Sequence, residues 1–476
     1  MIRHTLTLQE RHLHELRKAV LPASGHEGVA YLLCGTSAIE SDPWERDGEL
    51  RLLSREVIPL AAEDVITSSP DHVRARTATF TRVLKRARDT GMIPVYVHGH
   101  PGGYDRFSSQ DDADEPALIE LAQNRNGPEQ MLGSLVLAGP RRMFGRVWLN
   151  KKTHKPLSMI RSIGDRLLID FEGRENAGDV EALARQALAF GPALNADVAA
   201  LRFGIIGCGA TGSAVGLLLA RLGAQRIFAV DDDTAELTNL NRLHGATMRD
   251  VGDKDGRRGL AKTDILKRSM EEIGLGARVE TFKGWVGDPA CRNALKACDV
   301  IFACTDDHDG RMLLNRLSYF YLIPVIDMGI GIDFVDGSPP RITMADGRVS
   351  VVGPGHRCLL CRGVVDPKTA QEDDLLRRDP DEYYRLRERG ELYVRGGGRP
   401  NPAVVTFTTH VACMAVDELL HRLSGYRSAG SVPHRVYKHR LLGEKRPGPR
   451  EGTCRVCVEQ HYWGRGDMSP FLDRTG

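Results

Sequence analysis

The sequence lacks the features that mark several classes of protein. Among its 476 residues no apolar run approaches the length of a membrane-spanning helix, and the most apolar helical segment, AVGLLLARLG, is interrupted by Arg221. The first 18 residues contain no apolar stretch of the kind found in a signal peptide. The net charge of +2 gives no general attraction to nucleic acid. We therefore expect a cytoplasmic protein without a membrane or nucleic-acid partner.

The composition predicts a globular chain with more than one domain. Hydrophobic residues make up 41% of the chain and charged residues 27%, as in soluble proteins, and 476 residues exceed a single ordinary core. Neither an internal repeat nor a low-complexity tract is visible. The expected organisation is an α/β domain over 1–164, a polar linker over 165–182, a second α/β domain over 183–465 and a tail over 466–476.

The first expected domain mixes helices and strands in a compact layered fold. It opens with a charged helix, and a second helix is expected over 71–91, ending at Gly91. Short apolar runs predict strands at 28–35, 51–60, 92–100, 132–139 and 145–150.

The second expected domain alternates strands with helices, which predicts a doubly wound, mostly parallel sheet. Residues 362–400 are dense in charge and should form a helical excursion followed by a mobile loop. The last helix is expected over 403–423, where the apolar spacing is amphipathic.

A glycine-rich turn follows the first strand of this sheet. Gly207, Gly209 and Gly212 form a GxGxxG motif, which lets backbone N–H groups approach a phosphate at a helix N-terminus. Asp231 ends the next strand, where a carboxylate can accept ribose hydroxyls. These features alone fit NAD as well as ATP.

Polar groups beyond the ribose position favour ATP. The segment from Asp231 to Arg242 also contains Asp233 and Asn239, and Lys262 opens a later helix. Arg242 and Lys262 can neutralise a triphosphate, and Asp306, at the end of the strand DVIFACTD, can hold Mg²⁺. Hydride transfer needs none of these, so an NAD-dependent oxidoreductase is the weaker alternative.

Four of the ten cysteines form two CxxC pairs, Cys358/Cys361 and Cys454/Cys457. In a reducing compartment this pattern predicts a metal before a disulfide, and four thiolates make a closed, structural zinc site. The pairs are far apart in the sequence, so such a site would join two distant segments. The other cysteines, Cys413 included, lie in apolar stretches and are expected to be buried.

A second constellation lies in the first domain. His98 and His100 are two residues apart on an expected strand and so share a face, and Asp111 follows at the start of a helix. Two histidines and a carboxylate leave one zinc position open, as catalysis requires. The competing interpretation is a capping box formed by Ser108 and Asp111.

Residues 185–460 resemble the ubiquitin-activating-type adenylyltransferases, which include bacterial activators of sulfur-carrier proteins. The glycine loop, DxDxxExxNLNR, the helix-opening lysine, CTDxxxxR and the paired CxxC motifs occur in the same order. The resemblance implies MgATP, an acyl adenylate, a ubiquitin-like partner that ends in glycine, and a homodimer. It implies that Asp231 binds ribose, that Asn239, Arg242 and Lys262 bind phosphate and that Asp306 binds Mg²⁺. Arg185 matches the arginine that reaches the partner subunit's ATP.

The sequence departs from that family in two places. An insert separates Arg242 from Lys262 and makes Lys254 a minor alternative to Lys262. No cysteine lies between Cys361 and Cys413, where many relatives keep a thioester cysteine. We therefore expect adenylation without a thioester on this chain, with the acyl group passing to another protein's nucleophile or to a separate conjugating enzyme.

Residues 10–160 resemble the JAMM (JAB/MPN) metallopeptidases, which include deubiquitinases, through the string HxHP…S…D. The resemblance implies catalytic zinc on His98, His100 and Asp111, with Ser108 stabilising the oxyanion. It also implies a glutamate general base on the first core strand, for which Glu27 is the candidate and Glu40 the poorer alternative.

The two resemblances together predict a bifunctional enzyme of a bacterial ubiquitin-like protein system. One half adenylates the terminal glycine, and the other cuts the peptide or isopeptide bond that follows it. One alternative is a sulfur-carrier adenylyltransferase for cofactor or cysteine synthesis. Another is a JAMM domain that only docks the partner protein.

Overall fold

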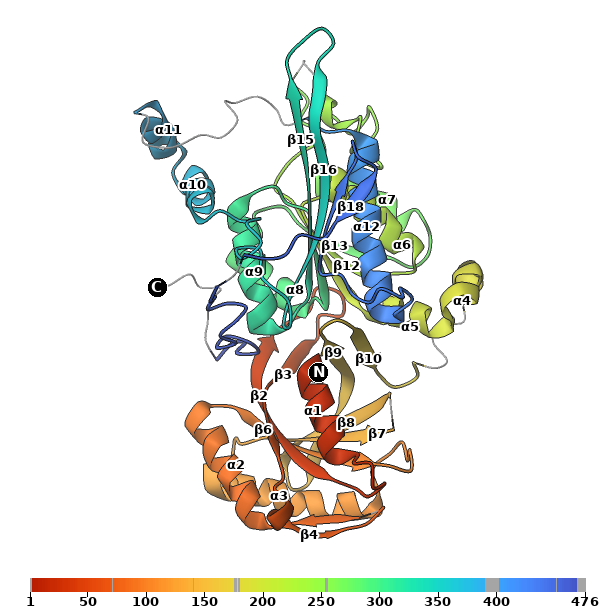
Figure 1. The fold of residues 1–476 in the computed structure, drawn as a ribbon, viewed down its shortest axis with the longest axis vertical. Coiled ribbons are helices and arrows are strands. Elements are labelled where there is room, and N and C mark those ends of the chain that lie inside the picture. Colours follow the sequence, from red (N-terminus) through yellow and green to blue (C-terminus); the bar gives the residue numbers. More distant parts are fainter. Residues whose placement is uncertain are drawn as a thin grey trace. The chain divides into compact units, whose positions relative to one another are not determined.

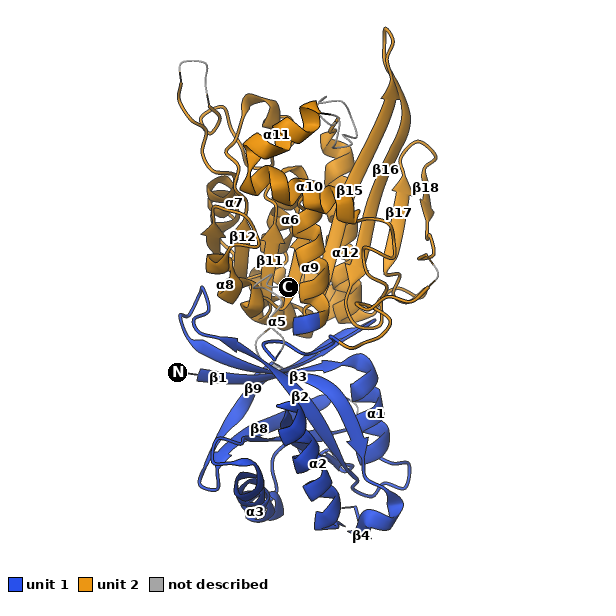
Figure 2. Ribbon diagram, turned by 90° about the vertical axis from the view of Figure 1, so that its left-hand side faces the viewer, with its two compact units in different colours: residues 1–176, 320–322, 462–476 blue, residues 177–319, 323–461 orange. Residues whose placement is uncertain are grey.

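The computed structural model describes residues 2–70, 72–139, 141–174, 178, 180–252, 256–389, 402–450 and 452–468. The chain separates into two compact units, coloured in Figure 2. Unit 1 comprises residues 1–176, 320–322 and 462–476, and unit 2 comprises residues 177–319 and 323–461.

Unit 1 is built on one strongly curved sheet. Its strands are β1 (Ile2–Gln9), β2 (Val29–Ile39), β3 (Gly48–Pro59), β6 (Ile93–His100), β7 (Leu132–Ala138), β8 (Arg142–Asn150), β9 (Thr153–Ile163) and β10 (Leu167–Asp170). They follow the order β1-β3-β2-β6-β7-β8-β9-β10. Because β1 also pairs in parallel with β9, the strands from β1 to β9 in this order close into a ring.

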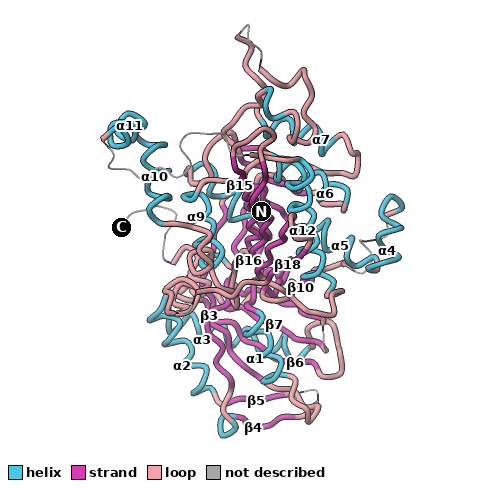
Figure 3. Tube along the Cα trace, turned by 45° about the horizontal axis from the view of Figure 1, so that its top comes forward, coloured by secondary structure: helices cyan, strands magenta, loops and turns pink. Residues whose placement is uncertain are grey.

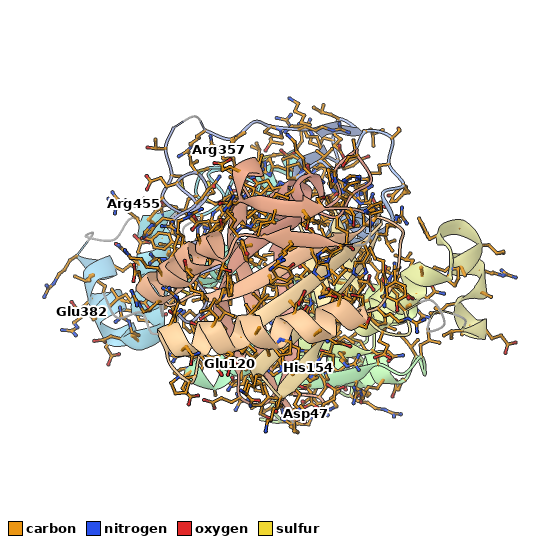
Figure 4. The ribbon with its side chains drawn as sticks, turned by 90° about the horizontal axis from the view of Figure 1, so that it is seen from below. Asp47, Glu120, His154, Arg357, Glu382 and Arg455 are labelled. Atoms are coloured by element: carbon orange, nitrogen blue, oxygen red, sulfur yellow. The ribbon has the colours of Figure 1, made fainter. Side chains whose placement is uncertain are left out.

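Helices cover both faces of this sheet because side chains alternate along its strands. On β2, Leu32 packs with the apolar side of α1 (Glu10–Val20). The next residue, Leu33, faces α2 (Thr77–Thr90) and α3 (Ser109–Asn126), the helix on which Glu120 is labelled in Figure 4. A hairpin of β4 (Val65–Ser68) and β5 (Val73–Ala75) follows the short turn η1 (Ala62–Asp64).

Unit 2 contains a doubly wound sheet with the order β13-β12-β11-β14-β15-β16-β17-β18. The strands are β11 (Arg202–Ile206), β12 (Arg226–Val230), β13 (Arg278–Phe282), β14 (Val300–Ala303), β15 (Val325–Val335), β16 (Arg341–Val352), β17 (His434–Lys438) and β18 (Gly443–Lys445). β13 to β15 run parallel, and β16 to β18 continue the sheet in antiparallel fashion.

The helices of unit 2 lie on both faces of the sheet (Figures 1 and 3). One face carries α6 (Ala210–Arg221), α7 (Lys262–Glu271) and α12 (Val405–Ser424), and the other carries α8 (Arg292–Ala297) and α9 (His308–Tyr321). The remaining helical elements are α4 (Ala184–Phe190), α5 (Pro192–Ala200), α10 (Pro367–Arg378), α11 (Pro380–Glu388) and the turns η2 (Glu181–Leu183), η3 (Leu237–Asn239) and η4 (Pro289–Cys291).

Several sequence expectations need correction. The chain opens with β1, and its first helix begins only at Glu10, because the alternating run IRHTLTLQ pairs with two other strands. The helix expected from residue 71 begins at Thr77, and β9 was not expected. The mostly parallel sheet expected for unit 2 is present from β13 to β15, and β16 to β18 extend it in antiparallel fashion.

The expected linker and tail also differ in part. Residues 167–170 of the linker form β10, which pairs with β9. In the tail, Gly466 bridges Thr36 and the Asp467 carboxylate accepts from the Ala38 N–H, so residues 462–468 belong to unit 1. The charged segment forms α10 and α11 as expected, but its expected mobile loop and Lys254 lie outside the described residues. No helix among the described residues is long and apolar enough to cross a membrane.

Candidate functional site

Unit 2 has a cleft of about 700 Å³ where its parallel strands end. Most of the residues singled out for a nucleotide line it, although they come from four separate segments. They are Gly207, Gly209, Asp231, Asp233, Asn239, Arg242, Lys262 and Asp306. The position is the one that the doubly wound fold favours, at the carboxyl ends of its strands.

The turn after β11 requires glycine for two different reasons. Gly207 has φ +91°, a conformation that side chains disfavour. A Cβ atom on Gly212, in α6, would lie 1.8 Å from the carbonyl oxygen of Gly207, so this glycine allows the helix to approach the turn. Gly209 lies between them with no atom within 4 Å of a Cβ atom there, so its backbone faces the open cleft.

Asp231 is fixed by the backbone around it. Its Oδ2 accepts from the Cys208 N–H at 2.6 Å, and its Oδ1 accepts from the Asp233 N–H at 2.9 Å. Burial raises the pKa of Asp231, and the charge of Lys262 partly offsets this shift. The carboxylate is thus held rigidly at the end of β12, where it lines the cleft.

Lys262 begins α7 and is surrounded by acidic groups. Its Nζ donates to the Asp233 carboxylate, and its backbone N–H donates to the Asp233 carbonyl at 3.1 Å. Burial lowers the pKa of Lys262, but Asp233, Asp231 and Asp306 together raise it above its ordinary value. The ammonium therefore stays charged at the cleft.

Asn239 and Arg242 lie on the loop after β12. The side-chain oxygen of Asn239 accepts from the Glu236 N–H at 3.0 Å, which leaves the amide nitrogen for a ligand. The Arg242 guanidinium donates to the Thr238 carbonyl and to Asn241. Arg185 lies on α4, is exposed and does not line the cleft, so its role toward a partner subunit stays a prediction.

Sequence reasoning assigned no role to three further residues of this region. Arg311, Asp327 and Arg348 form an ion-paired group at the cleft, joined by Asp327. Arg311 is the last residue of the CTDxxxxR motif and was therefore visible in the sequence. Asp327 and Arg348 lie on β15 and β16, and only the pairing of those strands brings them together.

The two CxxC pairs meet in unit 2. The four Sγ atoms lie within 4.8 Å of one another, with Cys358 3.8 Å from Cys454 and Cys361 3.5 Å from Cys457. Arg357, which precedes the first pair, and Arg455, which lies within the second, are labelled in Figure 4, and Arg357 Nη1 donates to the Gly452 carbonyl. The cluster has the donor set of a closed tetrahedral zinc site. Cys413 differs from expectation because it is exposed on α12.

The metal-type constellation of unit 1 is also assembled. His98 and His100 leave the same face of β6, and Asp111 lies on the first turn of α3. His98 Nε2 is 3.1 Å and His100 Nε2 3.6 Å from the Asp111 carboxylate. His100 Nδ1 lies 2.8 Å from the Tyr104 carbonyl, which orients Nε2 toward the carboxylate. Both ring nitrogens of His98 are buried; Nδ1 makes no hydrogen bond to any described residue, and Nε2 has the Asp111 carboxylate as its polar neighbour.

Two further residues complete this site. Glu27 lies two residues before β2, next to the end of β6, and burial raises its pKa, while His98 and His100 act to lower it. Ser108 caps α3: its Oγ donates to Asp111 Oδ2 at 2.8 Å and accepts from the Asp111 N–H. The capping box expected as the competing interpretation is therefore present, and it positions a metal-type ligand. Glu40 follows the far end of β2 and is exposed.

Comparison with known proteins matches both units. The profile described as "ThiF family" matches residues 183–455, and the profile described as "Prokaryotic homologs of the JAB domain" matches residues 9–149. The fusion that the motifs predicted is thus confirmed.

Individual relatives match shorter stretches. Ubiquitin-like modifier-activating enzyme 5 of Oryza sativa subsp. japonica is 23% identical over 189 residues, 37% of this chain and 41% of the relative. Molybdopterin-synthase adenylyltransferase of Haemophilus influenzae is 27% identical over 124 residues, 26% of this chain and 47% of the relative. The chain thus spans less than half the length of these relatives. Among solved structures, E. coli MccB with ATP shows 17% identity over 59% of this chain and 76% of that chain, with a TM-score of 0.43.

Proposed function

Because the chain belongs to the ThiF family, we propose that unit 2 uses MgATP to adenylate the C-terminal glycine carboxylate of a ubiquitin-like protein. The JAB-like domain at residues 9–149 would be a zinc-dependent peptidase or isopeptidase that cuts the bond after the same glycine. Curated relatives carry the names of ubiquitin-like modifier activators and of molybdopterin-synthase adenylyltransferase, which supports a carrier protein as substrate.

One observation carries the adenylation proposal: a single cleft collects the glycine turn, Asp231, Lys262 and Asp306. A carboxylate oxygen of the carrier forms a bond to the α-phosphorus of ATP. The bond between that phosphorus and the oxygen bridging to the β-phosphate breaks, and pyrophosphate leaves with its electron pair. The charged Lys262 and Arg242 stabilise the negative charge on the phosphates, which hydride transfer would not require.

Asp306 is the residue that would hold Mg²⁺. Its side chain is exposed, its carboxylate makes no hydrogen bond among the described residues, and oxygen donors suit this ion. Bound Mg²⁺ would neutralise phosphate charge. Arg185 would act on the ATP of a partner subunit in a homodimer, consistent with its exposure outside the cleft.

The four-cysteine cluster would hold a structural zinc ion. Four converging thiol groups leave no position for substrate, and they join residues 358–361 to residues 454–457. The residues therefore fit the ion in number, type and spacing, and the site would hold together two segments far apart in the chain.

His98, His100 and Asp111 would hold the catalytic zinc ion. The Nε2 atoms of the two buried histidines and the Asp111 carboxylate lie within 4.8 Å of one another, which fits three ligands of one metal ion. Bound zinc would supply a Lewis acid. Glu27, whose pKa is raised by burial, would accept a proton from the attacking water. Ser108 would stabilise the oxyanion.

Two alternative functions differ from this proposal. In one, the carrier is a sulfur-carrier protein for cofactor or cysteine synthesis, which the similarity to molybdopterin-synthase adenylyltransferase supports. The loop before α12, where many relatives keep a thioester cysteine, has none, and Cys413 lies on the helix itself. The acyl group would therefore pass to a nucleophile on another protein. In the other, the JAB-like domain only docks the carrier.

The adenylation proposal is tested by ATP–pyrophosphate exchange with a small ubiquitin-like protein that ends in glycine. Exchange should require the terminal glycine and be lost in Asp306→Ala. Glu272→Gln, which removes an exposed carboxylate outside the cleft, should retain it. No exchange with intact MgATP binding would show that the acyl substrate is not such a protein.

The peptidase proposal is tested on a fusion in which a reporter domain follows the same glycine. Glu27→Gln and His100→Ala should abolish cleavage. Glu40→Gln is the matched control, since Glu40 lies beyond the far end of β2. Cleavage that survives His100→Ala would contradict the proposed zinc site, and a native chain that binds the fusion without cutting it would favour the docking alternative.

A further inference from the structure

One end of the nucleotide cleft is formed by β15 and β16 rather than by the phosphate-binding segments. In the antiparallel register Gly329 faces Arg348, and Asp327 faces Ser350. Residues directly opposite in such a pair point to the same side of the sheet. Gly329 and Arg348 line the cleft, together with Gly331 two residues further along β15.

A buried carboxylate holds the Arg348 guanidinium in place. Asp327 is fully buried, its Oδ1 accepts from Arg348 Nη1, and its Oδ2 accepts from Arg311 Nε at 3.1 Å. Arg348 Nη1 also donates to Ser350 Oγ at 2.8 Å, and Ser350 Oγ lies 2.9 Å from His434 Nδ1. One carboxylate thus serves two guanidinium groups, which leaves one excess positive charge in this group. Asp346, which also lines the cleft from β16, is paired with Lys438 at 2.6 Å.

The guanidinium is fixed from one side and open on another. Nη2 of Arg348 makes no hydrogen bond among the described residues, although the side chain is only 17% exposed. A Cβ atom on Gly329 would lie 2.9 Å from that Nη2 atom. The glycine therefore keeps the free N–H group accessible from the cleft, and a rigid guanidinium is well suited to bind a carboxylate.

The position of this group separates it from the phosphate site. Arg348 reaches back over β15, and β14 lies between β15 and β11, whose glycine turn would hold the phosphates. Two strand spacings amount to roughly 10 Å. The guanidinium thus lies on the side from which an acyl group would approach the α-phosphate, next to two glycines that leave room for an extended chain.

We propose that Arg348 binds the terminal carboxylate of the acyl donor, and then the carbonyl oxygen of the acyl adenylate, with Asp327 and Ser350 as its positioning residues. The inference rests on the proposed adenylation. Arg348 would be a residue that selects the acyl substrate, and it lies outside the motifs assigned to the ribose and the phosphates. Two anions must meet at this step, and Arg348 supplies the positive charge on the acyl side.

The test needs no identified carrier. The probe is 5′-O-[N-(glycylglycyl)sulfamoyl]adenosine, a stable analogue of a glycyl adenylate, and its affinity is compared with that of MgATP by calorimetry. Arg348→Gln should weaken the analogue by about ten- to a hundredfold, the loss of one charge-assisted hydrogen bond or two. MgATP affinity should change less than about twofold, and Arg348→Lys should recover part of the analogue affinity.

Controls separate a role at the cleft from damage to the fold. Arg341→Gln, an exposed arginine of the same strand, should leave both affinities unchanged. Ser350→Ala keeps the ion pair and should weaken the analogue by a few fold, with an unfolding temperature close to that of the native chain.

Three results would overturn the inference. One is an equal loss of MgATP and analogue affinity in Arg348→Gln, another is no change in either, and the third is a native chain that binds MgATP but not the analogue. A native chain that binds neither ligand would mean that the proposed function itself is wrong.

Discussion

The glycine turn gives the sharpest test of the nucleotide site, because two of its glycines serve different purposes. A methyl group on Gly209 would meet no atom within 4 Å, and its φ of −73° suits any residue. A methyl group on Gly212 would lie 1.8 Å from the Gly207 carbonyl oxygen and 2.9 Å from its carbonyl carbon. The methyl group on Gly209 would project into the cleft, whereas the one on Gly212 would collide with the backbone against which α6 packs.

We expect Gly209→Ala to keep the fold and weaken ATP binding. The methyl group would hold a phosphate away from the backbone N–H groups of the turn. Losing one such hydrogen bond to a charged group costs about 1.5–3 kcal/mol. That is roughly ten- to a hundredfold in the dissociation constant of MgATP. The free energy of unfolding should stay within about 0.5 kcal/mol, as for surface substitutions.

We expect Gly212→Ala to destabilise unit 2, because α6 must shift by more than an ångström to relieve the contact. Overpacking of this kind costs about 1–3 kcal/mol. Urea unfolding monitors stability, and calorimetry with MgATP monitors binding in both variants. Native ATP affinity in Gly209→Ala would refute the assignment of the turn to phosphate. Equal destabilisation by the two substitutions would refute the division of roles.

Three other predictions follow from single contacts. Cys358→Ser, or removal of metal by a chelator, should lower the free energy of unfolding in urea by at least about 4 kcal/mol. Cys413→Ser, which changes an exposed cysteine, should leave it unchanged. Equal stability of the two variants would contradict a structural metal. Ser108→Ala removes the cap of α3 and should lower the free energy of unfolding by about 1 kcal/mol in the same assay. It should also weaken zinc binding in a chelator competition. Unchanged zinc affinity would show that the cap does not position Asp111. Burial, with a smaller effect of Arg11, lowers the pKa of His12 to about 3, so the unfolded chain binds this proton more readily and stability falls as the pH drops below about 6.5. His12→Gln should remove about 2 kcal/mol of the loss between pH 7 and pH 5, and identical pH profiles in urea would contradict the buried neutral histidine.

Local chemistry was readable from the sequence wherever the functional groups lie close together in the chain. The glycine turn is one example, since a strand, three glycines and a helix start within a few residues define a phosphate-type loop. His98 and His100 are another, because alternation along a strand puts both on one face without any tertiary contact. The family profiles cover these same motifs.

Long-range pairing decided features that no local pattern could predict. The opening strand β1 was missed because its stability comes from partners about 45 and 155 residues away in the sequence. By contrast, the short strand β10 was missed although its partner β9 is adjacent in the sequence: Leu167 pairs with Ile163, in a hairpin that was taken for part of a linker. The polar segment of β1 forms a strand because β3 pairs with it on one side and β9 on the other.

The sequence by itself determined which chemical groups the chain has and which of them are close neighbours: the glycine turn, the histidine pair, the two CxxC pairs and the carboxylates that end strands. Only the tertiary structure decided which of these meet. It brought Glu27 to the histidines while leaving Glu40 at the other end of the same strand. It also joined the cysteine pairs and placed Asp327 beneath Arg348. The physical reason is that side-chain chemistry is a local property, whereas proximity depends on strand register and on burial across the whole sheet.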